Sequence, residues 1–206
     1  MNVADETRET CSRRELKTRV HELLAAPDEE ESLRELRALP RPTVISSLLA
    51  ELCNPAETIK WRAVAALGAL TAELAEKDLE AGRGILRRLI WSLNEESGAM
   101  GWGAPEAMGE IMARHEALAR EFAPILVSFI APGPNFLGHP ALLRGAVWGI
   151  SRLAGARPEL MKDAVPHLIE RLNSPDQTTK ELATQALKTL SEKSGALKPP
   201  REAPRR

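Results

Sequence analysis

Aromatic residues are scarce in this chain: they make up 3% of its 206 residues, and tyrosine is absent. Strands favour aromatic and β-branched side chains, so this scarcity argues against a sheet. Alanine and leucine, which favour helices, occur throughout the sequence. Because 43% of the residues are hydrophobic and 28% are charged, we expect a folded, all-α protein with closely packed helices.

Further absences narrow the classes of function. No apolar run approaches the roughly 18 residues of a membrane-spanning helix, and the polar start of the chain does not resemble a signal peptide. The two cysteines, Cys11 and Cys53, lack the spacing of a metal site, which indicates reduced thiols in a cytoplasmic protein. A formal net charge of −1 gives no field that would attract nucleic acid or an anionic membrane. We therefore expect neither as a partner.

The ends of the chain differ from its middle. Residues 1–11 have no apolar periodicity and are predicted to form a flexible arm. Residues 195–206 read GALKPPREAPRR, with three prolines and a net charge of +3, and are predicted to form a disordered basic tail. Residues 12–194 are predicted to form a single domain.

An internal repeat organises this middle region. The helix-start signal Asn54-Pro55 returns 120 residues later as Ser174-Pro175. Intermediate copies align at steps of 41, 40 and 39 residues through Leu67, Met108, Trp148 and Leu187. Each copy follows another predicted helix, and these first helices span 43–52, 81–93, 120–130 and 159–172. With a first pair at 12–39, the sequence predicts about five antiparallel helix pairs stacked into an α-α superhelix.

The repeated segments resemble HEAT-like repeats, including the short bacterial form labelled phycobilisome-lyase HEAT-like. The resemblance is carried by NPAETIKWRAVAALGAL at 54–70, GHPALLRGAVWGI at 138–150 and SPDQTTKELATQALKTL at 174–190. It implies a bacterial HEAT-like solenoid in which the second helix of each pair lines the concave surface. The third repeat departs from the pattern, because no proline follows Asn94.

The segment 91–112, which reads WSLNEESGAMGWGAPEAMGEIM, is the candidate binding region. If residues 95–112 are wound as one helix at about 100° per residue, four side chains lie within about 80° of one another, opposite an apolar stripe. These are Glu95, Trp102, Glu106 and Glu110. Pro105 would interrupt such a helix, so the alternatives are a kink there or a fresh helix start at Gly103 with Pro105 in its first turn. In that case only Glu106 and Glu110 are certain to share a face.

The alignment also makes Trp61 and Trp102 equivalent positions in adjacent repeats. Exposed indoles beside glutamates would suit a cationic or amphipathic segment; alternatively, the indoles cover the seam between repeats. Arg144 lies on the corresponding helix of a flanking repeat. The resemblance to HEAT arrays implies that Arg144 either contacts a partner or ties the repeats together through Glu106 or Glu110.

Glycine and proline clusters also have two interpretations each. The glycines of the candidate region could form a backbone cradle for an anion or permit close contact between helices, and close contact is favoured. These glycines are Gly98, Gly101, Gly103 and Gly109. The loop 131–140 carries Phe136 and Leu137 at its tip, which would fold over the groove or pack on the next repeat.

The histidines do not predict a metal site. His21-Glu22 and His115-Glu116 are similar to the His-Glu pairs of HEAT-type di-iron hydroxylases, but that family has four such pairs and this sequence has two. No cofactor or metal is therefore expected.

Two functional hypotheses follow. The first is a non-enzymatic scaffold that binds a segment of another protein in the concave groove around Trp102 and Glu106. The alternative is a small-molecule-binding or lyase-like protein in which Glu106 or Glu110 transfers a proton. The first is favoured because no nucleophile elbow, phosphate loop or CxxC motif is present. The candidate binding residues are Trp61, Glu95, Trp102, Glu106, Glu110 and Arg144.

Overall fold

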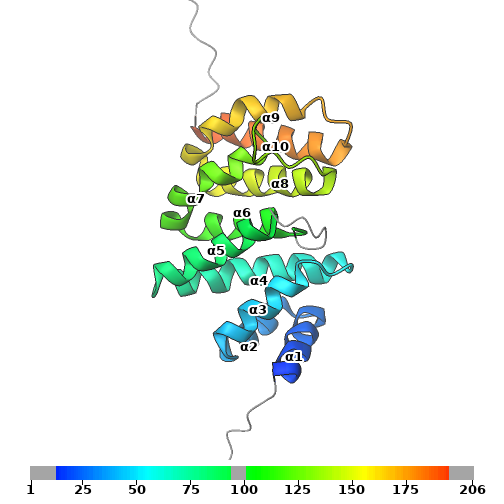
Figure 1. Cartoon of the computed structure of the whole chain (residues 1–206), viewed down its shortest axis with the longest axis vertical. Helices are drawn as coiled ribbons and strands as arrows, with labels where there is room; N and C mark the ends of the chain where they lie inside the picture. Colours follow the sequence, from blue (N-terminus) through cyan, green and yellow to red (C-terminus); the bar gives the residue numbers. More distant parts are fainter. Residues whose placement is uncertain (1–12, 94–100, 195–206) are drawn as a thin grey trace, which may run out of the picture. The chain divides into compact units, whose positions relative to one another are not determined.

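A computed structural model gives the fold of the chain (Figure 1) and describes residues 13–93 and 101–194. Within these ranges the regular structure is entirely helical, with ten α-helices and two short 3-10 helices. The predicted arm at 1–11, the predicted tail at 195–206 and Glu95 lie outside the described residues.

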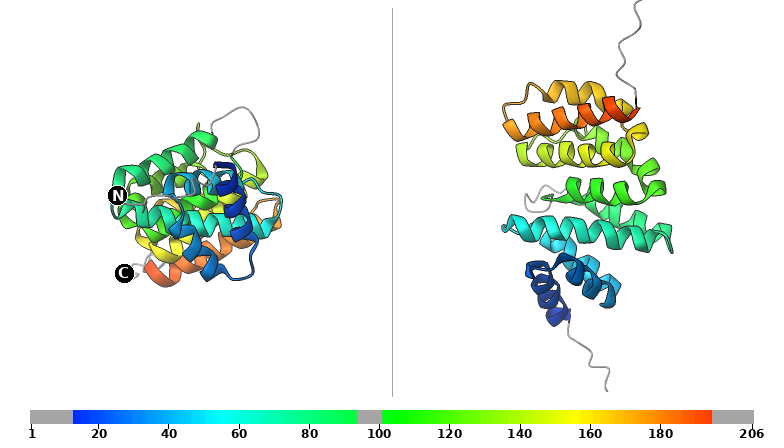
Figure 2. Two further views of the ribbon diagram at one scale, coloured as in Figure 1. Left: turned by 90° about the horizontal axis from the view of Figure 1, so that it is seen from below. Right: turned by 180° about the vertical axis from the view of Figure 1, so that it is seen from behind.

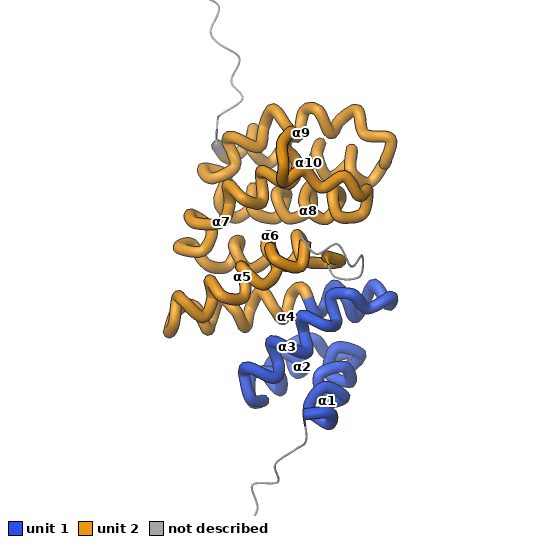
Figure 3. Tube along the Cα trace, in the orientation of Figure 1, with its two compact units in different colours: residues 1–63 blue, residues 64–206 orange. Residues whose placement is uncertain are grey.

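The chain divides into two compact units, residues 1–63 and residues 64–206 (Figure 3). The boundary falls inside helix α4, Glu57–Ala75. Each unit has buried apolar residues of its own, and a single domain over 12–194 stays a prediction.

The first unit contains the helices α1 (Arg13–Ala25), α2 (Glu29–Ala38) and α3 (Arg41–Glu51). Its largest fully buried side chains are Leu24, Leu36 and Leu48. Asp28 caps α2 by accepting a hydrogen bond from the Glu31 amide at 2.9 Å. Arg62 donates to Leu24 O at 3.0 Å and also to Ala26 O. The start of α4 is thereby tied to the end of α1.

The second unit contains the rest of α4 and six further α-helices: α5 (Leu79–Leu93), α6 (Ala104–Arg114), α7 (Glu116–Ser128), α8 (Pro140–Ala156), α9 (Val165–Arg171) and α10 (Gln177–Ser194). Helices α6, α8 and α10 follow one another in one layer, as the right-hand view of Figure 2 shows. Helices α5, α7 and α9 pack on this layer as the first members of their pairs. The ten described helices are the number that five predicted pairs require.

Two predicted helices differ from the observed ones. Helix α7 begins at Glu116, earlier than predicted, because the His115 side chain caps it and accepts from the Leu118 amide at 3.3 Å. The predicted helix 159–172 is divided into η1 (Pro158–Leu160), η2 (Lys162–Ala164) and α9. Proline cannot donate a backbone hydrogen bond, and Pro166 is accommodated in the first turn of α9.

Helix α6 starts afresh at the glycine that precedes it. Gly103 has a left-handed φ of 74°, which a side chain would disfavour. Its carbonyl accepts the Ala107 amide at 2.9 Å, and Pro105 lies in the first turn. One continuous helix through 95–112 was therefore the wrong alternative, and the helix start at Gly103 is confirmed.

Candidate functional site

Helix α6 is buried on all of its sides over Ala104–Met112. Glu106 and Glu110 are each only 5% exposed. The prediction that these carboxylates form an acidic face open to solvent is therefore wrong. The helical wheel identified their shared position on α6 correctly, but neighbouring helices cover that position.

Helices α4 and α8 approach α6 closely at glycine residues, where no side chain holds the helices apart. A Cβ atom added to Gly68 of α4 would lie 2.5 Å from Glu110 Cγ, and one added to Gly145 of α8 would overlap Glu106 Oε2. Gly109 and Gly149 meet in the same way, since a Cβ on either residue would overlap backbone atoms of the other helix. Close helix contact across small residues is confirmed at Gly109, and it helps to explain why α6 has no solvent-facing side over Ala104–Met112.

Glu110 is held by two arginines from different repeats. Arg114, one turn further along α6, donates from Nε to Glu110 at 2.6 Å. Arg152 of α8 donates from its own Nε, also at 2.6 Å. The buried carboxylate thus ties adjacent repeats together. Arg152 was missed in the sequence, although its separation of 42 residues from Glu110 is close to the repeat length.

Arg144 ties the next two repeats. Its guanidinium donates to both carboxylate oxygens of Asp176, at 2.8 and 3.0 Å. Asp176 also accepts from the Thr179 amide and hydroxyl at the start of α10. The hydrogen bond from Arg144, followed by that from the Thr179 hydroxyl, lowers the pKa of Asp176 from 3.8 to about 2. Glu110 pairs with Arg114 and Arg152 rather than with Arg144, whereas a contact between Arg144 and Glu106 stays a prediction.

Trp102 lies just before α6 and is partly exposed. Its ring meets that of His139 edge to face, with centroids 4.8 Å apart and planes at 84°. His139 is exposed and caps α8 by accepting from the Ala141 amide at 3.2 Å. An aromatic pair from two adjacent repeats is therefore accessible at the N-terminal ends of α6 and α8.

Trp61 belongs to the first unit, so its predicted position beside Trp102 stays a prediction. Within that unit its indole nitrogen donates to Glu57 at 2.8 Å, and the Lys60 ammonium lies 5.0 Å from its ring centroid. The indole is partly exposed.

The remaining candidates have local structural contacts. His21 contacts Glu51 at 3.1 Å, and His115 acts as the cap of α7. Phe136 is exposed beside Arg171, the last residue of α9, whose guanidinium lies 5.5 Å from the ring. The loop tip thus contacts the following repeat. Across 13–93 and 101–194, no three His, Cys, Asp or Glu residues are placed to share a metal ion.

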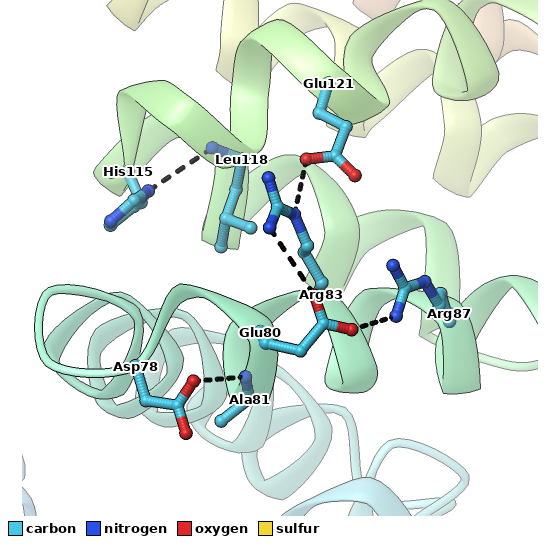
Figure 4. Close-up of polar contacts among 8 residues, drawn as sticks. All are labelled: Asp78, Glu80, Ala81, Arg83, Arg87, His115, Leu118 and Glu121. Atoms are coloured by element: carbon cyan, nitrogen blue, oxygen red, sulfur yellow. Dashed lines mark hydrogen bonds and ion pairs between the residues drawn. The ribbon is translucent and has the colours of Figure 1, made fainter.

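A second charged cluster lies on the outer layer of the second unit (Figure 4). Arg83 of α5 donates to Glu121 of α7 at 2.7 Å and lies 3.4 Å from Glu80. Glu80 also accepts from Arg87 at 2.5 Å, and this hydrogen bond lowers the pKa of Glu80. These side chains join two first-member helices at the surface.

Comparison with known sequences supports the repeat assignment. The HEAT-like repeat family model matches residues 140–190, which cover α8 to α10. An uncharacterised protein of Archaeoglobus fulgidus is 29% identical over 127 residues, which are 62% of this chain. The match spans 61% of that protein, about three fifths of its length.

Solved structures show the same architecture. The armadillo-repeats-only protein of Plasmodium falciparum superposes with a TM-score of 0.51 at 17% identity, over 92% of this chain and 84% of its own. A designed armadillo repeat protein in complex with the peptide (KR)4 gives 0.51 at 20% identity, over 86% and 82%.

These similarities confirm the predicted fold class. The chain is an all-α repeat protein of the HEAT-like and armadillo type. The phycobilisome-lyase subtype, the bacterial source and the cytoplasmic location stay predictions. In the described part of the chain, every helix is too short or too polar to cross a membrane.

Proposed function

We propose that this repeat protein is a non-enzymatic scaffold that holds a segment of another protein along the second helices of its pairs. The observation that carries the proposal is the accessible pair of Trp102 and His139 at the starts of α6 and α8, next to a helix that is buried over Ala104–Met112. An indole supplies large apolar contact area with few rotatable bonds, which is what a binding anchor requires.

The rigidity of the inner layer also supports the proposal. Glycine contacts hold α6 against α8, and Glu110 is bound by an arginine from each of these helices. A surface that is fixed before binding loses little conformational entropy when a peptide docks. The designed armadillo protein in complex with (KR)4 is a protein of this architecture that binds a peptide.

The candidate residues then have different roles in the proposal. Trp102 and Arg144 are assigned to direct contact, because both side chains are partly exposed. Glu106 and Glu110 are assigned to support the binding surface from beneath, because both are buried. Trp61 and Glu95 stay candidate contacts.

The alternative is a lyase-like or small-molecule-binding function with Glu106 or Glu110 as the proton-transfer group. It has weaker support, because two guanidinium groups occupy the carboxylate of Glu110 and the Gly145 backbone covers that of Glu106. Thermal stabilisation by a metabolite that is lost in Glu106→Gln would favour this alternative.

Selection of a random peptide library on the full chain tests the scaffold. We expect selected peptides to bind Trp102→Ala at least about tenfold more weakly, as for an interface anchor, with helicity unchanged by circular dichroism. Trp91→Ala is the matched control, because Trp91 is 63% exposed at the end of α5 in the outer layer. Failure to select any peptide, or equal binding by both variants, would contradict the proposal.

A further inference from the structure

The charges that α6 and α8 present to solvent are all of one sign. These helices carry two glutamates, Glu106 and Glu110, and three arginines, Arg114, Arg144 and Arg152. The glutamates are each 5% exposed, whereas the arginine side chains are 40%, 43% and 37% exposed. The carboxylates are therefore buried, and the guanidinium groups remain at the surface. The surface charge of these helices is positive, whereas the sequence predicted a negative one.

Arg114 and Arg152 are the closest together of these groups. Both donate from Nε to the same carboxylate, that of Glu110, at 2.6 Å. A guanidinium has five N–H donors, so the contact with Glu110 leaves further N–H groups of each arginine to donate to a second acceptor. Arg152 also places one terminal nitrogen 3.4 Å from Glu110. Within the described residues, Glu110 is the acidic partner of both arginines.

The cluster of Glu110, Arg114 and Arg152 has an excess positive charge. One carboxylate faces two guanidinium groups, so one positive charge is left near the surface. Two cations held close together repel each other, and a second anion between them would relieve that repulsion. Because Glu110 fixes both side chains in advance, such an anion would meet donors that already have their orientation.

We infer that Arg114 and Arg152 form a two-guanidinium site for a carboxylate of the bound segment, and that this segment is acidic. The inference rests on the proposed scaffold function and names the chemistry of its partner. A peptide side chain from Asp or Glu would accept the outward N–H groups of both arginines, while the indole of Trp102 would contact an apolar residue of the same peptide.

Further basic side chains lie near the cluster of Glu110, Arg114 and Arg152. Arg157 follows α8 and donates from Nε to Met112 O at 3.2 Å, and Lys193 of α10 donates to Gly155 O. Two acidic side chains also lie on this side: Glu116 pairs with Arg120 at 2.6 Å and lies 3.6 Å from Arg157, and Glu76 lies 3.6 Å from His115 Nε2. A basic peptide such as the (KR)4 bound by the designed armadillo protein would meet like charges here.

Titration with labelled octapeptides tests the inference directly. We expect the full chain to bind an alternating Asp-Glu peptide and not (Lys-Arg)4, with affinity for the acidic peptide falling as salt is raised. Arg114→Gln should weaken that binding by about tenfold or more, as for loss of one member of a charge pair. The control Arg88→Gln removes the same charge from the exposed face of α5 and should change nothing.

Folding controls keep the result interpretable. Arg114→Gln leaves the pair of Glu110 with Arg152 in place, so we expect unchanged helicity and an unchanged unfolding midpoint within a few degrees. Arg114→Lys restores the charge without the guanidinium fork and should recover only part of the affinity. Full recovery with lysine would overturn the two-guanidinium geometry.

The peptide selection separates the two proposals. If no peptide is selected, the scaffold function fails. If neutral or basic peptides are enriched, the scaffold function stands and the acidic-partner inference is overturned. Acidic peptides that bind the wild type and Arg114→Gln equally would overturn it too, as would a single-stranded oligonucleotide that binds through these arginines more tightly than any acidic peptide.

Discussion

Two of the charged clusters in the second unit join the same two adjacent repeats, one in each helix layer. The inner cluster is Glu110 with Arg114 and Arg152, between α6 and α8. The outer cluster is Arg83 and Glu121 with Glu80 and Arg87, between α5 and α7 (Figure 4). Their donor–acceptor distances are alike, at 2.6 Å within the first and 2.5 to 2.7 Å for the closest pairs of the second.

Burial distinguishes the two clusters. The Glu110 side chain is 7% exposed, whereas those of Glu80 and Glu121 are 62% and 38% exposed. A surface carboxylate that loses its arginine is solvated by water, and the pair contributes little. A buried carboxylate has no such replacement, so leaving it without any arginine partner costs much more stability. Equal geometry therefore does not mean equal contribution to stability.

Two glycines show a similar contrast, although Gly82 of α5 is itself close-packed, since a Cβ there would lie 2.7 Å from Ala75 Cβ. Gly84 of α5 has open space where a side chain would be, whereas Gly109 of α6 touches the backbone of α8. The outer charged cluster joins its helices through long side chains, whereas α6 and α8 are in backbone contact. Glu110 itself is covered by another glycine, Gly68 of α4, and its burial gives the inner cluster its importance.

The largest expected effect comes from separating the inner helices. Gly109→Val places a branched side chain where the Gly149 backbone lies, and we expect it to cost about 3 kcal/mol, the upper part of the usual range for overpacking. Urea denaturation measures this as a lower midpoint. The matched control is Gly84→Val on α5, which should leave the midpoint nearly unchanged. Similar midpoints for the two variants would show that the layers do not differ.

The sequence was sufficient to predict the repeats and most of the helices. Helix starts depend on residues close in the chain, such as Asp28 before α2, and the repeat length follows from aligned positions such as Leu67 and Met108. Both are local or periodic signals. The sequence alone does not decide where α6 starts, because Pro105 is compatible with a kink or with a first turn.

The exposure of the candidate site could not be predicted in the same way. A helical wheel shows which residues of α6 share a face, but not what covers that face. Glu106 and Glu110 are buried because glycines lie opposite them, at Gly145 and Gly68 in other repeats. The separation of 42 residues between Glu110 and Arg152 is consistent with a contact between adjacent repeats. It predicts that contact only if the repeats are aligned to within a few residues.

Removing the shared carboxylate should have the next largest effect. Glu110→Ala leaves Arg114 and Arg152 facing each other without an anion, and it opens a cavity beside Gly68. We expect a loss of about 2 to 3 kcal/mol in the free energy of unfolding, below the full cost of breaking a buried pair because both arginines reach solvent. Arg114→Ala with Glu110→Ala, in a double-mutant cycle, should recover part of that loss.

An effect of intermediate size is expected where a charge pair is partly buried. The pKa of Asp176 is held at about 2, chiefly by Arg144. Because the folded-state pKa lies below the ordinary value of 3.8, the stabilisation is complete above pH 4 or so and is lost as the pH falls towards 2. Allowing for the exposure of Arg144, we expect about 1 to 2 kcal/mol.

Asp176→Asn should therefore lower stability at pH 7 and make little difference at pH 2, measured by urea denaturation across this range. Asp163→Asn, at an exposed position in η2, is the control. A difference between wild type and Asp176→Asn that stays constant from pH 7 to pH 2 would mean that the ion pair with Arg144 is not its source.

The smallest effect is expected in the outer cluster, and it completes the comparison. Glu121→Ala removes the partner of Arg83 on α7, but Arg83 keeps its contact with Glu80 and water can solvate the remaining donors. We expect no measurable change in the urea midpoint at moderate salt. If Glu121→Ala were instead as damaging as Glu110→Ala, the contribution of these clusters would be set by bridging two repeats, and burial of the carboxylate would not be the deciding variable.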